Sequence, residues 1–183
     1  EVLIYHDGPV NRPIPELSGY TFNYKFKATK TRYNDWGHSL RDLGIREAKG
    51  DYIIHFNPDN LLYPDALEKI DYTSTTYHNN GEEISIIICP IIMEGCQRAC
   101  DARKPLMEYA LYRNRDTKSR VIMDGFPPHF GHIDCMQAVI RRGVWLREGG
   151  WHDKSEMSDA VLYMAMCDKY EYMSCGYIIG VHR

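Results

Sequence analysis

The segment GDYIIHFNPDNLLYP, residues 50–64, decides the fold that we expect for this chain. Its residues 52–56 form a short, β-prone and mostly apolar run, and this length and β-branching favour a buried strand over a helix. Pro58 has no N–H to donate to a ladder, so the strand has to end there. The strand therefore brings a carboxylate and two amides to its carboxyl end, the edge at which open α/β sheets bind ligands.

The polar residues at this strand end allow two interpretations. Asp59, with the neutral amides of Asn57 and Asn60 beside it, suits a hard divalent cation that substrate phosphates also hold. The same side chains would equally form an Asx turn that caps a helix beginning at Asp65. Spacing alone does not separate a cation site from a turn.

The composition is that of an ordinary globular domain. The 183 residues fit one domain with a sizeable core, and the net charge of −3 argues against a nucleic-acid partner. No apolar run is long enough for a transmembrane segment, and no signal peptide is visible at Glu1. The six cysteines lack zinc-ribbon spacing and are expected to be free thiols. We therefore expect a cytoplasmic protein, represented here by one domain excised from a longer chain.

Strand-like and helix-like segments alternate in the first half of the chain. The elements predicted by hydrophobic pattern and turn residues are, in chain order, strands over 1–5 and 20–27, a helix over 38–49 capped by Gly50, a strand over 52–56, a helix over 64–73 and a single buried strand over 84–93. This alternation predicts an α/β fold with a mostly parallel sheet and helices on both faces.

The second half of the chain is less regular. Residues 94–131 lose the simple alternation of strands and helices. Their basic side chains would help to hold a diphosphate or would simply face solvent; they are Lys104, Arg113, Arg115, Lys118 and Arg120. Beyond them, the patterns predict an apolar segment over 133–140, a helix over 156–168 and a last strand over 177–181.

Residues 48–64 resemble the central block of the GT-A nucleotide-sugar glycosyltransferases of the family-2 type. Those proteins carry Ala-x-Gly-Asp-Tyr-Ile before a strand that ends in Asp-x-Asp, with a proline a few residues on. Here Asn57 stands in place of the first Asp, while Asp59 keeps the second, metal-binding position. Residues 37–45 are similar to the family's Gly-x-Ser-x-Ala-Arg-Asn-x-Gly block, with Arg41 on the family Arg and Asp42 in place of Asn.

The resemblance implies a fold and a division of the chain. The fold is GT-A, Rossmann-like, and a single such domain would span residues 1–183 without the family's first strand and helix. Residues 1–93 would be the nucleotide-binding half, and residues 94–183 the acceptor and catalytic half.

The resemblance also implies roles for particular residues. Asp7, at the end of the first predicted strand, and Arg41 would contact the base, ribose or phosphate of the nucleotide, and Gly131 would let the donor sugar approach the backbone. Asp59 and His182 would hold Mn²⁺ or Mg²⁺. The residues alone leave alternatives open, in which Asp7 is a turn residue, Arg41 a paired surface arginine and His182 a surface histidine.

Two acids compete for the role of catalytic base. Glu156 and Asp159 are three residues apart, so on a helix they would share a face. Asp159 is preferred because Leu162 and Tyr163 follow it at the spacing that anchors a helix, whereas Glu156 lies at the fraying end. In the first turn, the helix dipole favours the ionised carboxylate. The alternative is that either acid only caps free helix amides.

The implied function is transfer of a sugar from a nucleotide diphosphate sugar, with a UDP-sugar favoured, to a hydroxyl group. The acceptor would be a glycan, a lipid-linked molecule or a protein, and family-2 members mostly invert the anomeric centre. A non-catalytic nucleotide- or sugar-binding domain is one alternative, made plausible by Asn57 and the missing first strand and helix. A sugar-nucleotide pyrophosphorylase is another, although residues 8–12 match its expected Gly-rich, basic loop poorly.

Overall fold

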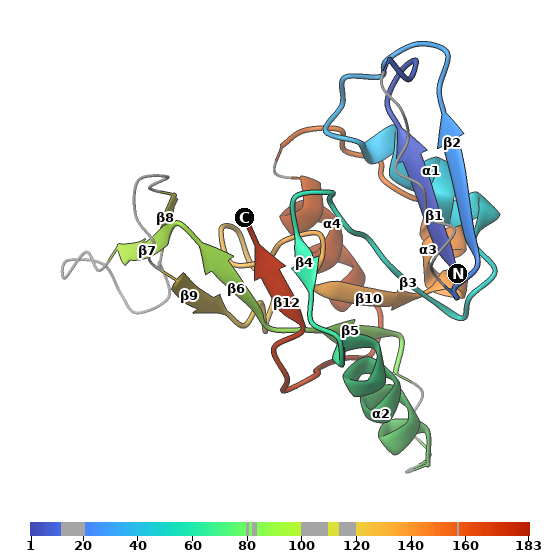
Figure 1. Cartoon of the computed structure of the whole chain (residues 1–183). Coiled ribbons are helices and arrows are strands. Elements are labelled where there is room, and N and C mark those ends of the chain that lie inside the picture. The colour runs from blue at the N-terminus through green and yellow to red at the C-terminus, as the bar shows by residue number, and fades with distance from the viewer. Residues whose placement is uncertain (12–20, 80, 82–83, 100–109, 114–119, 157) are drawn as a thin grey trace. The chain divides into compact units, whose positions relative to one another are not determined.

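The structure, a computed structural model, describes residues 1–11, 21–79, 81, 84–99, 110–113, 120–156 and 158–183, and only the backbone of residues 79, 96–99 and 110–113. The chain forms two compact units (Figure 1). The first unit comprises residues 1–53 and 141–158, and the second comprises residues 54–140 and 159–183. The expected nucleotide-binding and acceptor halves are a division by function and stay a prediction.

The first unit is built on a parallel pair of strands. β1 (Val2–His6) runs parallel to β2 (Tyr24–Ala28), with Val2 opposite Tyr24 and His6 opposite Ala28. Two helices complete it, α1 (His38–Glu47), which lies against β1, and α3 (Arg142–Glu148). The buried side chains of the helices include Ile45 on α1 and Val144 and Trp145 on α3. β1 lies within one residue of its predicted position, α1 begins where predicted, and β2 begins at Tyr24 within the strand predicted over 20–27.

Helix α1 ends earlier than expected. Its last residue is Glu47, and Ala48 is the C-cap, with ψ of 144° and its N–H donating to Gly44 O at 2.8 Å. The prediction that Gly50 caps this helix is therefore wrong, because the extended backbone at Ala48 already turns the chain away from the helix. The segment then enters β3 (Tyr52–Ile54), the strand expected over 52–56.

The second unit contains two small sheets whose strands run in both directions. In one, β5 (Ile86–Ile88) lies between β11 (Tyr172–Ser174), which is parallel to it, and β10 (Ala138–Arg141), which is antiparallel. The other has the order β4 (Leu61–Leu62), β12 (Gly180–His182), β6 (Ile91–Glu94) and β9 (Arg120–Met123). The remaining elements are the antiparallel hairpin β7 (Cys96–Ala99) and β8 (Ala110–Arg113), and the helices α2 (Ala66–Asn79) and α4 (Ser158–Cys167).

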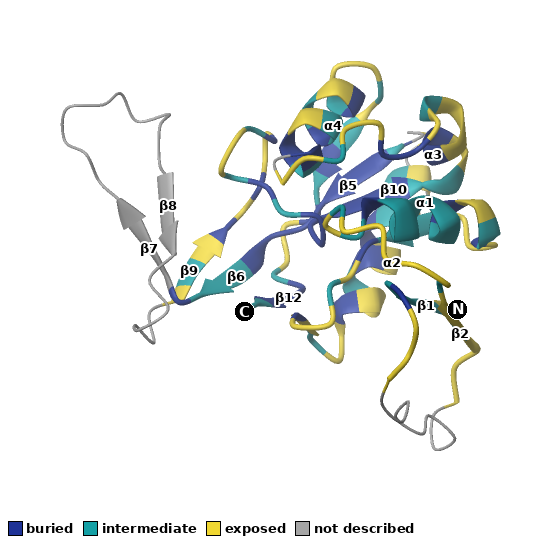
Figure 2. Ribbon diagram, turned by 90° about the horizontal axis from the view of Figure 1, so that it is seen from above, coloured by how far each residue is buried: buried dark blue, intermediate teal, exposed yellow. Residues whose placement is uncertain are grey.

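The most apolar stretch of the chain forms two strands and not one. β5 pairs within the first sheet and β6 within the second, with Cys89 and Pro90 between them. Pro90 cannot donate a ladder hydrogen bond, so it ends the pairing of β5. All three residues of β5 are completely buried, as the dark blue of this strand in Figure 2 shows.

The directions of the strands correct the prediction of a mostly parallel sheet. β6 pairs parallel with β12 and antiparallel with β9, and β12 pairs antiparallel with β4. A parallel neighbour requires a long crossover, usually a helix, whereas the described parts of residues 94–123 hold short strands and no helix. The chain thus returns antiparallel in this region. The architecture is mixed α/β, and none of the described helices is both long and apolar enough to cross a membrane.

Candidate functional site

Asp7 lies at the carboxyl end of β1, as expected, and its carboxylate bonds to the chain itself. Oδ1 accepts a hydrogen bond from Tyr33 N at 2.8 Å, and Oδ2 accepts one from Asn34 N at 3.1 Å. Each carboxylate oxygen can accept more than one hydrogen bond, so this arrangement leaves acceptor capacity. Asp7 therefore holds the segment that follows β2 and can still contact a ligand.

Arg41, the other predicted nucleotide contact in this unit, is also engaged by the protein. Its Nη1 donates to Trp36 O at 3.1 Å and to His38 Nδ1 at 2.8 Å, and its guanidinium carbon lies 5.1 Å from the centre of the Trp151 ring. A guanidinium has no acceptor, so His38 Nδ1 must accept and be unprotonated. Asp7 and Arg41 thus contact the backbone of the same loop, residues 33–36.

His38 is a buried residue that the sequence analysis missed. Because its proton lies on Nε2, that atom donates, to Ser155 O at 3.0 Å and to Ser158 Oγ at 2.8 Å. Its ring stacks on Trp151 with 4.7 Å between centres. Burial lowers the pKa of the imidazole, and nearby Arg41 lowers it further, so the neutral form is favoured.

Asp42 makes the second link between α1 and the segment after α3. Its Oδ1 accepts a hydrogen bond from Trp151 N at 2.7 Å, and its Oδ2 lies 2.6 Å from Lys154 Nζ. Gly150 has φ of +91°, and a Cβ there would lie 2.3 Å from Asp42 Oδ1. Only glycine therefore fits beside this carboxylate.

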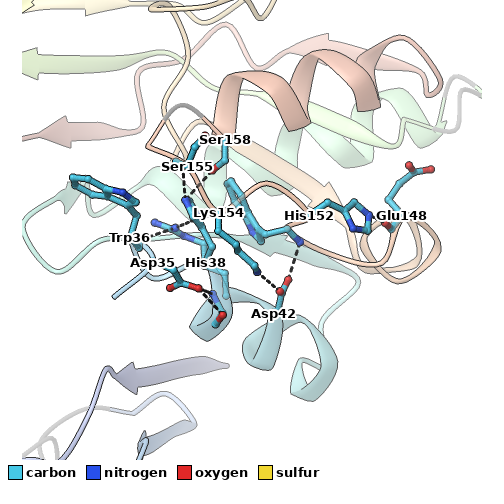
Figure 3. Close-up of polar contacts among 12 residues, drawn as sticks. Asp35, Trp36, His38, Asp42, Glu148, His152, Lys154, Ser155 and Ser158 are labelled. Carbon is cyan, nitrogen blue, oxygen red and sulfur yellow. Dashed lines mark hydrogen bonds and ion pairs between the residues drawn. The ribbon is translucent and has the colours of Figure 1, made fainter. Parts of the chain in front are cut away.

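These contacts form one polar group, which we call the His38 network (Figure 3). It fastens the segment between α3 and α4 to α1, and every polar contact in it comes from the chain itself. Its signal in the sequence was weak, since a histidine on a helix and a tryptophan after two glycines are common. The residues of the network are His38, Arg41, Asp42, Trp151, Lys154, Ser155 and Ser158.

The polar segment that follows β3, residues 57–60, lies in the second unit. Residues 57–60 form a turn in which Asn60 N donates to Asn57 O at 3.1 Å. This turn leads into β4 and does not cap α2, whose first residue, Ala66, donates to Tyr63 O. Asp59 is exposed, and no hydrogen bond or ion pair of its side chain is found within the described residues.

Asn60 and His182 carry buried polar atoms that have no hydrogen-bond partner in the described part of the chain. Asn60 is only 4% exposed, yet neither atom of its amide has a hydrogen-bond partner among the described residues, and the same holds for His182 Nδ1. The antiparallel register of β4 and β12 pairs Val181 with Leu61, and His182 and Asn60 are the next residues along the two segments. A buried polar group without a partner costs about 1–3 kcal/mol, so this place has bonding capacity to offer a ligand.

Close backbone contact brings these two strands together. A Cβ at Gly180 would lie 2.1 Å from Leu61 O, so only glycine allows β12 to approach β4 this closely. His182 Nε2 lies 3.4 Å from Asp134 Oδ2. We call Asp59, Asn60, Asp134 and His182 together the Asp59 edge.

Within the described residues, the Asp59 edge does not form a closed metal cage. Across the part of the chain that is described, no group of three or more His, Cys, Asp or Glu side chains could hold a metal ion alone. Mg²⁺ typically binds one or two protein carboxylates and completes its shell with water and substrate phosphates. The donors present, with Asp59 and His182 foremost, are compatible with such a cation, and its binding stays a prediction.

The two candidate bases do not share a helix. Asp159 lies in the first turn of α4, as predicted, where its Oδ1 accepts a hydrogen bond from Ala160 N at 2.7 Å. Glu156 is exposed and precedes α4, which begins at Ser158. The prediction that both acids project from one helical face is therefore wrong. That Asp159 acts as a base stays a prediction.

The structure also describes Gly131 and one of the basic residues that the sequence singled out, Arg120. Gly131 has φ of +71°, and a Cβ at this position would meet no atom within 4 Å, so the space beside it is open. Arg120 lies 2.9 Å from Glu94, its partner in the β6–β9 ladder, as expected for a solvated face. The other basic positions fall outside the described residues or side chains; they are Lys104, Arg113, Arg115 and Lys118.

Comparison with solved structures identifies a protein whose fold is similar to that of this chain. No protein-family model matches this chain, and no curated protein sequence does. The crystal structure of S. aureus TarS 1–349 matches 99% of this chain with a TM-score of 0.67 and 10% sequence identity. The chain shares the fold of TarS.

A structure of TarS 1–349 in complex with UDP matches the whole chain with a TM-score of 0.63 and 9% identity. In both comparisons this chain spans 50% of the TarS chain. At such low identity the likeness establishes the fold, and the roles of individual residues have to be argued from the chain itself.

Proposed function

We propose that this chain is a glycosyltransferase domain that binds a nucleotide diphosphate sugar, preferably a UDP-sugar, and transfers the sugar to an acceptor hydroxyl with inversion. The observation that carries the proposal is the Asp59 edge, where the exposed carboxylate of Asp59 precedes Asn60 in the chain, and the buried amide of Asn60 and one imidazole nitrogen of His182 have no partner among the described residues. The edge ends the segment that resembles the Asp-x-Asp region of GT-A enzymes. The fold shared with TarS, of which a UDP complex is known, supports the same conclusion.

The residue roles in this proposal follow the chemistry of each group. Asp59 and His182 would hold Mn²⁺ or Mg²⁺, with Asn57 and Asn60 as neutral donors beside them. Such a cation supplies positive charge that offsets the charge of the departing diphosphate. Asp7 and Arg41 would border the nucleotide, and Gly131 the donor sugar.

Asp159 would act as the general base. It takes the proton of the acceptor hydroxyl while the hydroxyl oxygen attacks the anomeric carbon and the bond from that carbon to the diphosphate oxygen breaks. Its place in the first turn of α4 stabilises the ionised carboxylate, because the amino end of a helix favours negative charge.

Calorimetric titration of the chain with UDP, with and without Mn²⁺, tests the proposal. We expect binding that Mn²⁺ strengthens, and release of UDP when UDP-sugars are supplied with hydroxyl acceptors. Absence of binding to UDP, GDP, ADP and dTDP in both conditions would contradict the proposed function.

A non-catalytic nucleotide-sugar-binding domain is the second candidate, because Asn57 replaces a carboxylate in the Asp-x-Asp position. Metal-dependent UDP binding without any release of UDP from UDP-sugars would favour it. Release of pyrophosphate would instead indicate a sugar-nucleotide pyrophosphorylase.

A further inference from the structure

The loop of residues 29–37 begins where two parallel strands end together. Thr29 N donates to His6 O at 3.1 Å, and Gly8 N donates to Thr29 Oγ1 at 2.7 Å, so the segments after β1 and β2 are tied to each other. The carboxyl ends of parallel strands are where α/β folds bind their ligands. This loop therefore occupies a ligand-binding position of the first unit.

Side chains from both flanking elements hold the loop. The Asp7 carboxylate, after β1, accepts hydrogen bonds from Tyr33 N and Asn34 N. From α1, Arg41 donates to Trp36 O. At the end of the loop Asp35 Oδ2 accepts a hydrogen bond from Ser39 N at 3.0 Å. A loop fixed at so many points has a defined conformation.

The conformation held in this way is an unfavourable one that exposes a tryptophan. Trp36 has φ of +59° and Asn34 has φ of +53°, and a left-handed backbone is a genuine outlier for a bulky residue such as tryptophan. Trp36 is nevertheless 65% exposed, and Tyr33 is 48% exposed. In Figure 3 the indole of Trp36 points away from the His38 network, to which only its carbonyl is bound. Strain of this kind persists where the surrounding structure enforces it, commonly at binding sites.

We infer that Trp36, with Tyr33 in the same loop, is the stacking surface for the nucleobase of the donor nucleotide. The inference rests on the proposed function. A pyrimidine ring has a flat face that stacks on an indole, and such stacking needs an aromatic ring that is exposed and fixed in direction. A nucleobase is favoured over an acceptor sugar as occupant because Asp7 and Arg41, the polar groups suited to a nucleotide, hold this same loop.

Trp36→Gly separates a binding role from a structural one. Glycine adopts positive φ without strain, so the variant should keep a melting temperature within about 2 °C of the wild type. Its affinity for UDP, and for uridine in the absence of metal, should fall about tenfold or more. Trp36→Phe should recover most of this loss, because it restores an aromatic ring.

Asn34→Gly is the matched control, since it relieves the same kind of strain in the same loop and should leave the affinity for UDP unchanged. Tyr72→Ala, at a side chain 61% exposed on α2, controls for the removal of an exposed aromatic ring. The three tryptophans also give a direct signal. Trp145 and Trp151 are buried, so quenching of fluorescence by UDP should disappear in Trp36→Phe.

Each outcome is decisive. If the wild type binds UDP and Trp36→Gly binds it equally well, the inference is wrong while the proposed function stands. If Trp36→Gly instead raises only the KM of the acceptor, the loop binds the acceptor and the inference is also wrong. If the wild type binds no nucleotide, the proposed function fails, and the inference fails with it.

Discussion

The His38 network and the Asp59 edge contain similar side chains in opposite states. In the His38 network, histidine, arginine and carboxylate groups bond to one another and to backbone atoms of the chain. At the Asp59 edge, an amide that is 96% buried and one histidine nitrogen have no partner within the described residues. Folding normally pairs buried polar groups, because an unpaired one is costly. The polar groups of the His38 network thus satisfy one another, whereas the Asp59 edge keeps bonding capacity within the described residues.

The largest effect that we expect concerns Asp159, which follows Ser158, the last residue of the network. Asp159→Asn should keep UDP binding and lower the initial rate of sugar transfer about 10²–10⁴-fold, because a positioned base typically contributes that much. Glu156→Gln should change the rate far less, since Glu156 is exposed and lies outside α4. Rates with saturating donor measure both, and an inactive Glu156→Gln with an active Asp159→Asn would reverse the assignment.

The second largest effect that we expect is a loss of Mn²⁺-dependent affinity for UDP when the exposed carboxylate of Asp59 is removed. Asp59→Ala should lower the Mn²⁺-dependent affinity for UDP about 100-fold, because loss of even an indirect metal contact costs about 10–100-fold. Asn57→Ala should only weaken binding, since its amide can at best assist. Calorimetry with Mn²⁺ measures both variants.

Asp71→Ala, on the exposed surface of α2, is the control for removal of a carboxylate. Equal UDP affinity of Asp59→Ala and the wild type in the presence of Mn²⁺ would exclude Asp59 as a metal ligand.

Matched apolar substitutions in the two regions should change the free energy of unfolding in opposite directions. Asp42→Leu should lower the free energy of unfolding by about 2 kcal/mol, because it leaves Trp151 N and Lys154 without their acceptor. Asn60→Leu should raise the free energy of unfolding by about 1 kcal/mol, because it removes a buried amide that has no partner, while it weakens UDP binding. Urea unfolding of both variants is the measurement. If Asn60→Leu destabilises the protein, the side-chain amide of Asn60 has hydrogen-bond partners in the folded protein. The polar groups of the Asp59 edge would then already be satisfied.

The smallest effect is a dependence of stability on pH through His38. Burial and Arg41 lower its pKa in the folded protein below the ordinary 6.5, so the unfolded chain binds the proton more readily. The stability that neutral His38 contributes is therefore fully present above about pH 6.5 and is lost as the pH falls from there through the lower folded pKa. Asp35, Arg41 and Lys154 are the charged groups that act on this imidazole. His38→Gln should flatten the profile below about pH 6.5 relative to the wild type, as followed by melting temperature. An unchanged profile would show that His38 does not titrate in this range.

Much of the fold was predictable because its signals are local. A turn signal placed the end of β1, an apolar stripe at helical spacing placed α1, and the acid followed by a packed helical face placed Asp159 in the first turn of α4. Pro58 correctly predicted that the strand before it ends. Pro90 carries the same signal, and its position in a long isoleucine run concealed the division between β5 and β6.

The sequence by itself determined an α/β chain and the strand end that carries Asp59, since propensity and turn chemistry act between near neighbours. Only the tertiary structure decided the strand directions and which polar groups are satisfied. His38 and Ser155 are 117 residues apart, and no local pattern distinguishes their contact from a surface histidine and a loop serine. The missing partners of Asn60 are likewise a property of packing, because an amide is costly only where the fold removes it from water.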